Sequence, residues 1–233
     1  MWQPTHAELM SAIAFVLSEE EIHSDAFFIH GPPMEDDKFE KIELKIASNF
    51  YKRGYASKIL LNGITHRECC DSKLNYKGFE RWKETLVSFG VKENDIAIFK
   101  SAKHTGTEST NMLLFAKKND WKTVTIMSHP IHQLRCFLTA IGIMKSTGFF
   151  LKVYNRTFPL QRSDWIRDLT KIVLGGNTVM GSNDISGNMQ DHINEEYKRI
   201  IFYAQDPKVV GKHFTRHATI PEMFEYVKMR EGI

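Results

Sequence analysis

The chain has 233 residues, of which 42% are hydrophobic and 25% are charged, and this balance is typical of a soluble globular protein with a sizeable core. Its 31 basic and 28 acidic residues leave a net charge of +3, and the scattered lysines form no stripe of the kind that follows a nucleic-acid backbone. The three cysteines, of which Cys69 and Cys70 are neighbours and Cys136 stands alone, favour neither a disulfide scaffold nor a C-x-x-C zinc site and fit a reducing compartment.

The first predicted element is a helix around the apolar segment LMSAIAFVL at 9–17. This segment is too short to cross a bilayer and lacks the basic region that begins a signal peptide. We therefore expect a cytoplasmic protein without a membrane segment.

Strands and helices are predicted to alternate from residue 25 to residue 155. Short apolar runs predict strands at 25–31, 57–63, 95–99, 122–127 and 149–155, and apolar residues at helical spacing predict helices at 36–54, 75–90, 107–119 and 130–145. In the first of these helices, Phe39, Ile42, Ile46 and Phe50 are expected to form the core-facing side. The alternation predicts a three-layer, Rossmann-like α/β sandwich of about five mostly parallel strands.

Residues 156–233 are predicted to form a helical extension that packs on the 1–155 core, the two making one structural unit. Helices are expected at 163–176, 191–204 and 219–231. Segment 177–190 is rich in Asn, Ser and Gly, and we expect it to be a loop that folds over the site as a lid.

The ends of the strands are where ligand-binding residues are expected, because open parallel sheets bind ligands outside the carboxyl ends of their strands. Polar residues or glycines follow four of the predicted strands, and the candidates are His30, Gly31, Asn62, Gly63, Lys103, His104, Thr105, Gly106, Thr107, Ser128 and His129. A glycine such as Gly31 would let a ligand approach the backbone closely; a rigid turn there and a solvated loop at 62–67 are the alternatives. The chain has neither a G-x-G-x-x-G fingerprint nor a Walker loop.

The segment 103–107 leads into the N-terminus of a predicted helix. Free N–H groups and the positive end of the helix dipole favour an anion there, such as a phosphate or a carboxylate. The alternative is that Thr105 or Thr107 simply caps the helix, with Glu108 adding charge to its first turn.

The segment MSHPIHQLRC begins another predicted helix, in which Ser128 or His129 is expected to be the N-cap and Pro130 to lie in the first turn. His129 and His132 are three residues apart, but neither a third ligand nor an H-E-x-x-H motif accompanies them, so we expect no metal site. His132 and Arg135 share a helical face, which suits an acid or base beside a group that binds an anion.

A second histidine pair, His213 and His217, lies in the C-terminal extension. Without a third ligand nearby, these two residues are expected to belong to a solvated basic segment.

Several of these motifs, taken in order, resemble the DUF218 family of YdcF-, SanA- and ElyC-like proteins. The matching parts are DAFFIHG at 25–31, FYKRGYASKILLNG at 50–63, LVSFGVKENDIAIF at 86–99, Thr105 with Glu108, and His132 with Arg135. The resemblance covers about residues 25–155 and is greatest to the soluble YdcF-like branch, since the chain shows no N-terminal membrane anchor. It implies a Rossmann-like fold, a site that includes Glu108, His132 and Arg135, and binding of S-adenosylmethionine or a nucleotide.

The chain departs from the family pattern at several positions. Gly78 stands where the family has a glutamate, and Glu80 is the nearest acid. Ser128 replaces a threonine, Leu134 replaces a proline, and Pro32 replaces the second glycine of the first loop.

The sequence supports two hypotheses about function. In the first, the protein is an enzyme, a transferase or hydrolase acting on a phosphate-bearing, nucleotide-like or S-adenosylmethionine-like small molecule, with Glu108, His132 and Arg135 as catalytic residues. In the second, it is a non-catalytic module that binds or senses a nucleotide or S-adenosylmethionine. Both expect a small-molecule partner, and neither involves a metal, a nucleic acid or a membrane.

Overall fold

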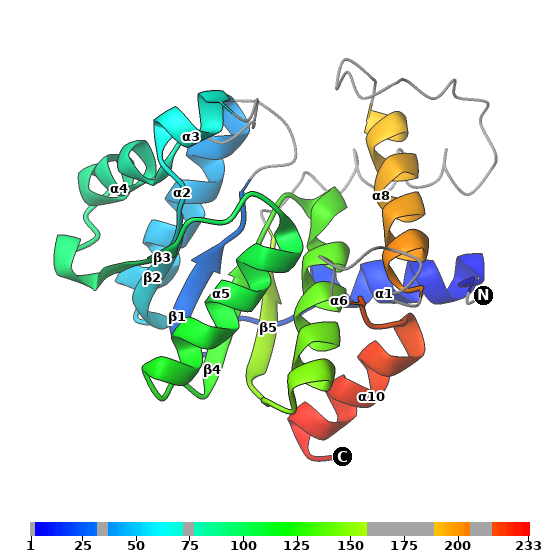
Figure 1. The fold of residues 1–233 in the computed structure, drawn as a ribbon. Helices are drawn as coiled ribbons and strands as arrows, with labels where there is room; N and C mark the ends of the chain where they lie inside the picture. The colour runs from blue at the N-terminus through cyan, green and yellow to red at the C-terminus, as the bar shows by residue number, and fades with distance from the viewer. Residues whose placement is uncertain (1–2, 32–36, 72–76, 158–188, 206–215) are drawn as a thin grey trace.

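The structure, a computed structural model, describes residues 3–31, 37–71, 77–157, 189–205 and 216–233. Its centre is a sheet of five strands, which are β1 (Ser24–Ile29), β2 (Ala56–Gly63), β3 (Ile96–Lys100), β4 (Thr123–Met127) and β5 (Lys152–Arg156). Their order is β3-β2-β1-β4-β5, and each neighbouring pair is parallel (Figure 1). The predicted α/β fold with a parallel sheet is therefore confirmed, with strand bounds close to those expected.

The central strand β1 shows why these apolar runs become strands buried on both faces. Successive side chains of a strand point to opposite faces of the sheet. Phe28 accordingly packs into one hydrophobic cluster, while Phe27 and Ile29 pack into another, and all three are fully buried. A continuous apolar run, rather than an alternating one, is what such a strand requires.

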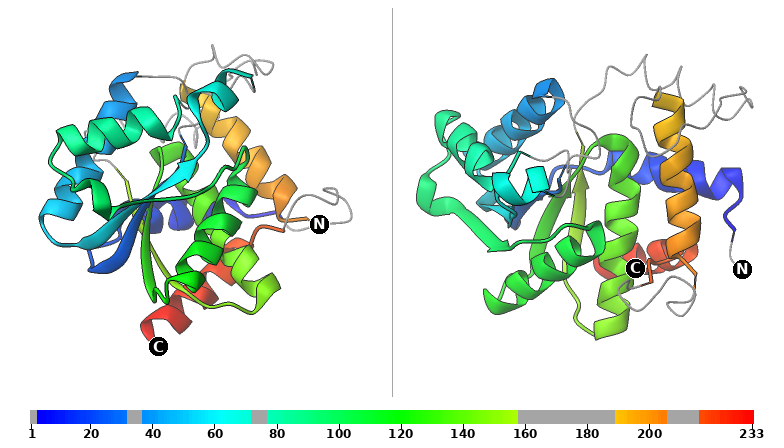
Figure 2. Two further views of the ribbon diagram at one scale, coloured as in Figure 1. Left: turned by 60° about the vertical axis from the view of Figure 1, so that its left-hand side comes forward. Right: turned by 45° about the horizontal axis from the view of Figure 1, so that its top comes forward.

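Helices cover both faces of the sheet. On one face lie α2 (Asp37–Lys52), α3 (His66–Asp71) and α4 (Phe79–Ser88), and on the other lie α5 (Thr105–Lys118) and α6 (Pro130–Thr147). Three further helices, α1 (His6–Ser18), α8 (Met189–Tyr203) and α10 (Ile220–Glu231), pack against α6 (Figure 2). None of the helices within the described ranges combines the length and the apolar composition needed to cross a bilayer.

The strand order creates a switch point between β1 and β4. From β1 the chain continues through α2 to β2, whereas from β4 it continues through α6 to β5 on the other side. The two strands pair so that Ile29 lies opposite Met127, and the N–H of His30 donates to the Met127 carbonyl at 2.8 Å. Folds of this kind bind their ligands at the edge where the chain diverges from two adjacent strands in this way.

The C-terminal segment is tied to the sheet through buried polar contacts. The Tyr226 hydroxyl accepts from the Val153 N–H at 2.7 Å, and Arg230 donates to the Val153 carbonyl at 2.6 Å. Arg230 also pairs with Glu19 just beyond α1. The end of α1 and the α10 helix are therefore joined beside β5.

The α2 helix differs from its predicted orientation. Ile42, expected to face the core, is 37% exposed, whereas Glu40, Glu43 and Leu44 are buried. The helix therefore turns acidic side chains toward the sheet in its first half, which apolar periodicity did not indicate. It stops as predicted at Gly54, whose φ of 79° is a conformation that favours glycine.

Some smaller expectations also changed. The α3 helix lies where a polar loop after β2 was considered, and α5 begins at Thr105 with His104 as its N-cap and no side-chain capping bond. The alternative that Thr105 or Thr107 caps this helix is therefore wrong. The predicted helix at 163–176 and nearly all of the predicted lid at 177–190 lie outside the described residues.

Candidate active site

A buried histidine–carboxylate pair lies at the carboxyl end of β1. The Nδ1 of His30 is 2.8 Å from Oε2 of Glu108, which lies in the first turn of α5. Oε1 of the same carboxylate accepts from the Gly31 N–H at 3.1 Å and from the Asn62 side-chain amide at 3.2 Å. Three donors on one buried carboxylate hold it in place. The carboxylate in turn keeps a proton on Nδ1 of His30 and leaves Nε2 as the nitrogen able to exchange one.

Asn62 positions the loop that follows β3. Its side-chain amide donates to the Ala102 carbonyl at 2.7 Å, and its side-chain oxygen accepts from the Ala102 N–H at 2.9 Å. This double hydrogen bond fixes the chain three residues before α5 begins. Asn62 therefore helps to place both Glu108 and the N-terminus of that helix.

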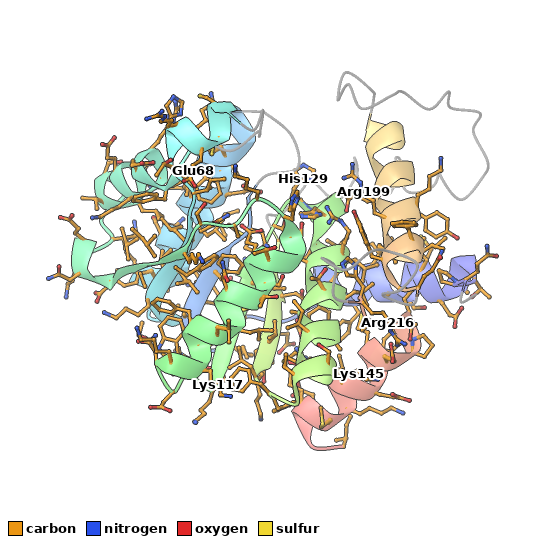
Figure 3. All side chains as sticks on the ribbon, in the orientation of Figure 1. Glu68, Lys117, His129, Lys145, Arg199 and Arg216 are labelled. Carbon is orange, nitrogen blue, oxygen red and sulfur yellow. The ribbon has the colours of Figure 1, made fainter. Side chains whose placement is uncertain are left out.

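A second histidine–carboxylate pair joins α6 to α8. Nδ1 of His132 is 3.0 Å from Oε2 of Glu196, and Arg135 grips the same carboxylate through Nε at 2.5 Å and Nη2 at 3.2 Å. Arg135 also donates to the Thr105 hydroxyl at 3.1 Å, and Arg199 donates to Glu196 at 2.9 Å. Figure 3 labels Arg199 of this cluster on α8, and His129 just before α6.

Charge pairing sets the ionisation of this second cluster. Burial disfavours the charge of Glu196, but Arg135 and His132 outweigh it and hold the pKa of Glu196 well below its usual range. Burial and the charge of Arg135 oppose protonation of His132, but Cys136 and Glu196 outweigh them and raise its pKa. Arg135 is thus neutralised by a protein carboxylate, and its role here is to hold Glu196 and Thr105 in position.

The two histidines approach each other, with ring centroids 6.5 Å apart and ring planes at 81°. Cys136, one helical turn after His132, is fully buried beside them. Burial opposes a thiolate, but the charges of His132 and His30 outweigh it and lower the pKa of Cys136 to about 6. Burial opposes protonation of His30, but Cys136 and Glu108 outweigh it and raise the pKa of His30 to about 10. These opposite shifts describe one thiolate–imidazolium interaction.

The turn between β4 and α6 is also built of buried polar groups. The Ser128 N–H donates to the Gln133 side-chain oxygen at 2.7 Å, and the Gln133 amide donates to Asn155 at 2.8 Å. The His129 carbonyl accepts from the N–H groups of His132 and Gln133, so His129 lies at the N-cap position. Pro130 is the first helical residue, as predicted.

The structure brings together most of the residues singled out from the sequence. His30, Gly31, Asn62, Thr105, Glu108, His132 and Arg135 belong to the two hydrogen-bonded clusters, with Ser128 and His129 buried at the neighbouring strand end. Gly106 is partly exposed at the start of α5, and Lys103, His104 and Thr107 are exposed around it. Gly63 lies within β2, where a Cβ would come within 2.2 Å of the Phe99 carbonyl oxygen, so the close approach of β3 explains this glycine.

Two residues of the site escaped the sequence reasoning. Cys136 could have been found, because it lies one helical turn after His132 and on the same face. Glu196 is 64 residues from His132, and nothing in the sequence pairs the two. The burial of Glu43 was also missed, because the spacing of the isoleucines in α2 predicted a different buried face.

The expectation that His217 is solvated is wrong. His217 is 3% exposed, its Nε2 lies 3.0 Å from the Thr139 hydroxyl, and its ring packs on Tyr203. Burial and the charge of Arg135 lower the pKa of His217 to about 3, so this residue is neutral. His213, its predicted companion, lies outside the described residues.

A separate cavity of about 350 Å³ lies between α6 and α10, lined in part by Ile141, Met144 and Tyr226. It adjoins the last turns of α6, whereas His132 lies in the first. It is therefore not part of the polar site. Within the described ranges, no three His, Cys, Asp or Glu side chains gather as metal ligands would.

No protein-family model matches the chain, and no curated protein matches it.

Proposed function

We propose that this edge of the sheet is the active site of an enzyme, a transferase or hydrolase, that acts on a phosphate-bearing or nucleotide-like small molecule. The observation that carries the proposal is the pair of buried histidines, His30 and His132, each with Nδ1 on a carboxylate and with rings 6.5 Å apart. A carboxylate that orients a histidine is the usual arrangement for proton transfer, because it fixes the tautomer and steadies the imidazolium.

The N-terminus of α5 is the part of this site suited to a phosphate. The first helical hydrogen bond runs from the Glu108 N–H to the His104 carbonyl, so the N–H groups of Thr105, Gly106 and Thr107 precede it. Helix N-termini stabilise anions through such groups and through the dipole. Lys103 lies in the exposed segment before the helix and can add its charge.

The resemblance to the DUF218 family is part of the same proposal. Of the residues that carry its last two motifs, Thr105, His132 and Arg135 contact one another, and Glu108 of the same helix as Thr105 holds His30. S-adenosylmethionine therefore belongs among the ligands to be tested beside nucleotides and sugar phosphates.

A second candidate is a non-catalytic module that binds the same class of ligand. The observation in its favour is the burial of both histidines, of which His30 is 0% and His132 is 3% exposed. A buried histidine pair can hold a ligand without transferring a proton.

A thermal-shift screen of nucleotides, sugar phosphates and S-adenosylmethionine tests the proposal. A compound present at about 100 times its Kd should add roughly 2.7 kcal/mol of stability, which is a rise of roughly 5 to 10 °C in melting temperature for a domain of this size. If no compound raises the melting temperature, the proposal is wrong.

Variants then separate the two candidates. His30→Asn and His132→Asn should retain ligand binding and lose turnover in the enzyme, whereas His23→Asn, which lies outside the site against Gly54 and Tyr55, should behave as wild type. Turnover that survives in both site variants would contradict the catalytic role. Clear binding without turnover of any compound by the wild type would favour the binding module.

A further inference from the structure

The α2 side of the site carries a glutamate in an unusual environment. Glu43 is 0% exposed, and Glu40, one helical turn earlier, is 5% exposed. The next residue, Leu44, packs into the hydrophobic cluster beneath α2. Glu43 therefore faces the interior from a helix whose solvent side could have held it at no cost.

Both carboxyl oxygens of Glu43 are buried, and neither has a hydrogen-bond partner among the described residues. Glu40, by contrast, has Arg81 of α4 at 3.5 Å. Burying a carboxyl group without partners costs several kcal/mol of folding free energy by order of magnitude. Packing gives no reason for a glutamate at this position, since an apolar side chain would fill the space without that cost.

The position of Glu43 relates it to the two histidine pairs. The α2 helix follows the carboxyl end of β1, so its first half lies along the same edge of the sheet as the beginnings of α5 and α6 (Figure 1). Cys136, on the other side of β1, is near enough to affect the Glu43 carboxyl electrostatically. Glu43 therefore lies within electrostatic range of Cys136, which is buried beside the two histidines.

We propose that Glu43 receives a positively charged amino group of the ligand. This inference rests on the proposed function and narrows its substrate class to small molecules that carry both a phosphate and an amine. The amine would supply the hydrogen-bond donors that both oxygens of Glu43 lack, and a buried carboxylate is stable only when it is paired and hydrogen-bonded.

The charges around Glu43 favour a cation rather than a neutral donor. The groups that act on it are Glu40 on its own helix and Cys136 on α6, and both are negative when ionised. Arg81 is directed to Glu40 rather than to Glu43. A cation beside Glu43 would be attracted by the Glu43 carboxylate, and Glu40 would add to that attraction.

The same surroundings predict that binding releases a proton. Burial, with Glu40 and Cys136 adding to it, raises the pKa of Glu43 from 4.5 to about 8, so only about a tenth of the molecules have this group ionised at pH 7. An ammonium group selects the ionised form, and each binding event at pH 7 should release close to one proton from Glu43. A ligand with a hydroxyl in place of the amine should release none from it.

Matched pairs of phosphates test this inference by calorimetry. The pairs are 2-aminoethyl phosphate with 2-hydroxyethyl phosphate, and glucosamine 6-phosphate with glucose 6-phosphate, each titrated at pH 7 in two buffers of different ionisation enthalpy. The amino compound should bind the wild type about tenfold more tightly than its partner and release close to one proton. Glu43→Gln should lose both the preference and the proton release.

Two further variants serve as controls for folding and for the position of the substitution. Glu43→Met, which removes the buried polar group, should fold and likewise show no preference, and Glu84→Gln, on the exposed side of α4, should match the wild type. If a compound binds and the amine preference is absent, or persists in Glu43→Gln, this inference is wrong and the proposed function stands. If no compound in the pairs or in the wider screen binds, both are wrong.

Discussion

The ion pair that holds α8 against α6 gives the most demanding prediction about stability. Glu196 accepts from Arg135 at 2.5 and 3.2 Å and has Nδ1 of His132 at 3.0 Å. The side chains of Glu196 and Arg135 are only 5% and 11% exposed. Glu196→Gln keeps the shape of the side chain and removes its charge, so the buried guanidinium loses its counter-charge.

The size of the effect follows from this burial. Breaking a buried pair by removing one partner costs about 3 to 5 kcal/mol, because the other charge stays buried without compensation. The pair between Lys83 and Glu93 is the matched control, since its side chains are 32% and 66% exposed. Exposed pairs contribute about 0 to 1 kcal/mol, so Glu93→Gln should change stability by less than about 1 kcal/mol.

Urea unfolding measures both variants. With a slope of about 2 to 3 kcal/mol per molar urea, Glu196→Gln should lower the unfolding midpoint by roughly 1 to 2 M, and Glu93→Gln should leave it nearly unchanged. Replacing Glu196 and Arg135 together by Met should recover most of the loss, because no buried guanidinium is left without its carboxylate. If Glu196→Gln costs no more than the surface control, the argument from burial is refuted.

Three further predictions concern Glu43, Cys136 and Asn62. Because the pKa of Glu43 is raised, its contribution to folding stability is complete below about pH 4.5 and is lost as pH rises through about 8. In urea unfolding, the wild type should therefore lose up to about 5 kcal/mol of unfolding free energy relative to Glu43→Gln between about pH 5 and pH 9. Parallel plots of unfolding free energy against pH for the two proteins would contradict the burial of Glu43. The ultraviolet absorbance of the thiolate, taken as the difference between the wild type and Cys136→Ser, should titrate with a midpoint near the lowered pKa of about 6; a midpoint at that of an ordinary thiol would exclude the pairing with the histidines. Asn62→Ala leaves both backbone groups of Ala102 without their partner and should cost about 1 to 3 kcal/mol, whereas a loss below about 0.5 kcal/mol would show that water replaces the amide.

The strands and most helices were predictable from the sequence because their signals are local. A run such as AFFI in β1 has to be buried on both faces, and each predicted run became a strand, although the edge strand β3 is only partly buried. The order of the strands follows from long-range packing, which no local pattern encodes. The parallel arrangement was nevertheless predictable, since helices of sufficient length separate the strands.

The site residues that could be predicted from the sequence are those that lie at the ends of strands. His30 and Ser128 follow strands and Asn62 lies near the end of one, and the rule for parallel sheets singled them out. Glu196 lies on a helix far along the chain, and its burial, like that of Glu43, depends on tertiary packing. His217 shows the opposite error, because a polar residue in a basic stretch is solvated only if no other element covers it.

The two hydrophobic clusters of this fold lie on opposite faces of the sheet. Glu43 lies on a helix anchored in one cluster, through Leu44 and Ala47, whereas Cys136 belongs to the other. Substitutions on α2 therefore change the packing of one hydrophobic cluster and leave the cluster that contains Cys136 unchanged. In the proposed site, this division would let selection alter which molecule is accepted while the proposed catalytic groups stay where they are, and a designer could vary α2 in a library with the same freedom.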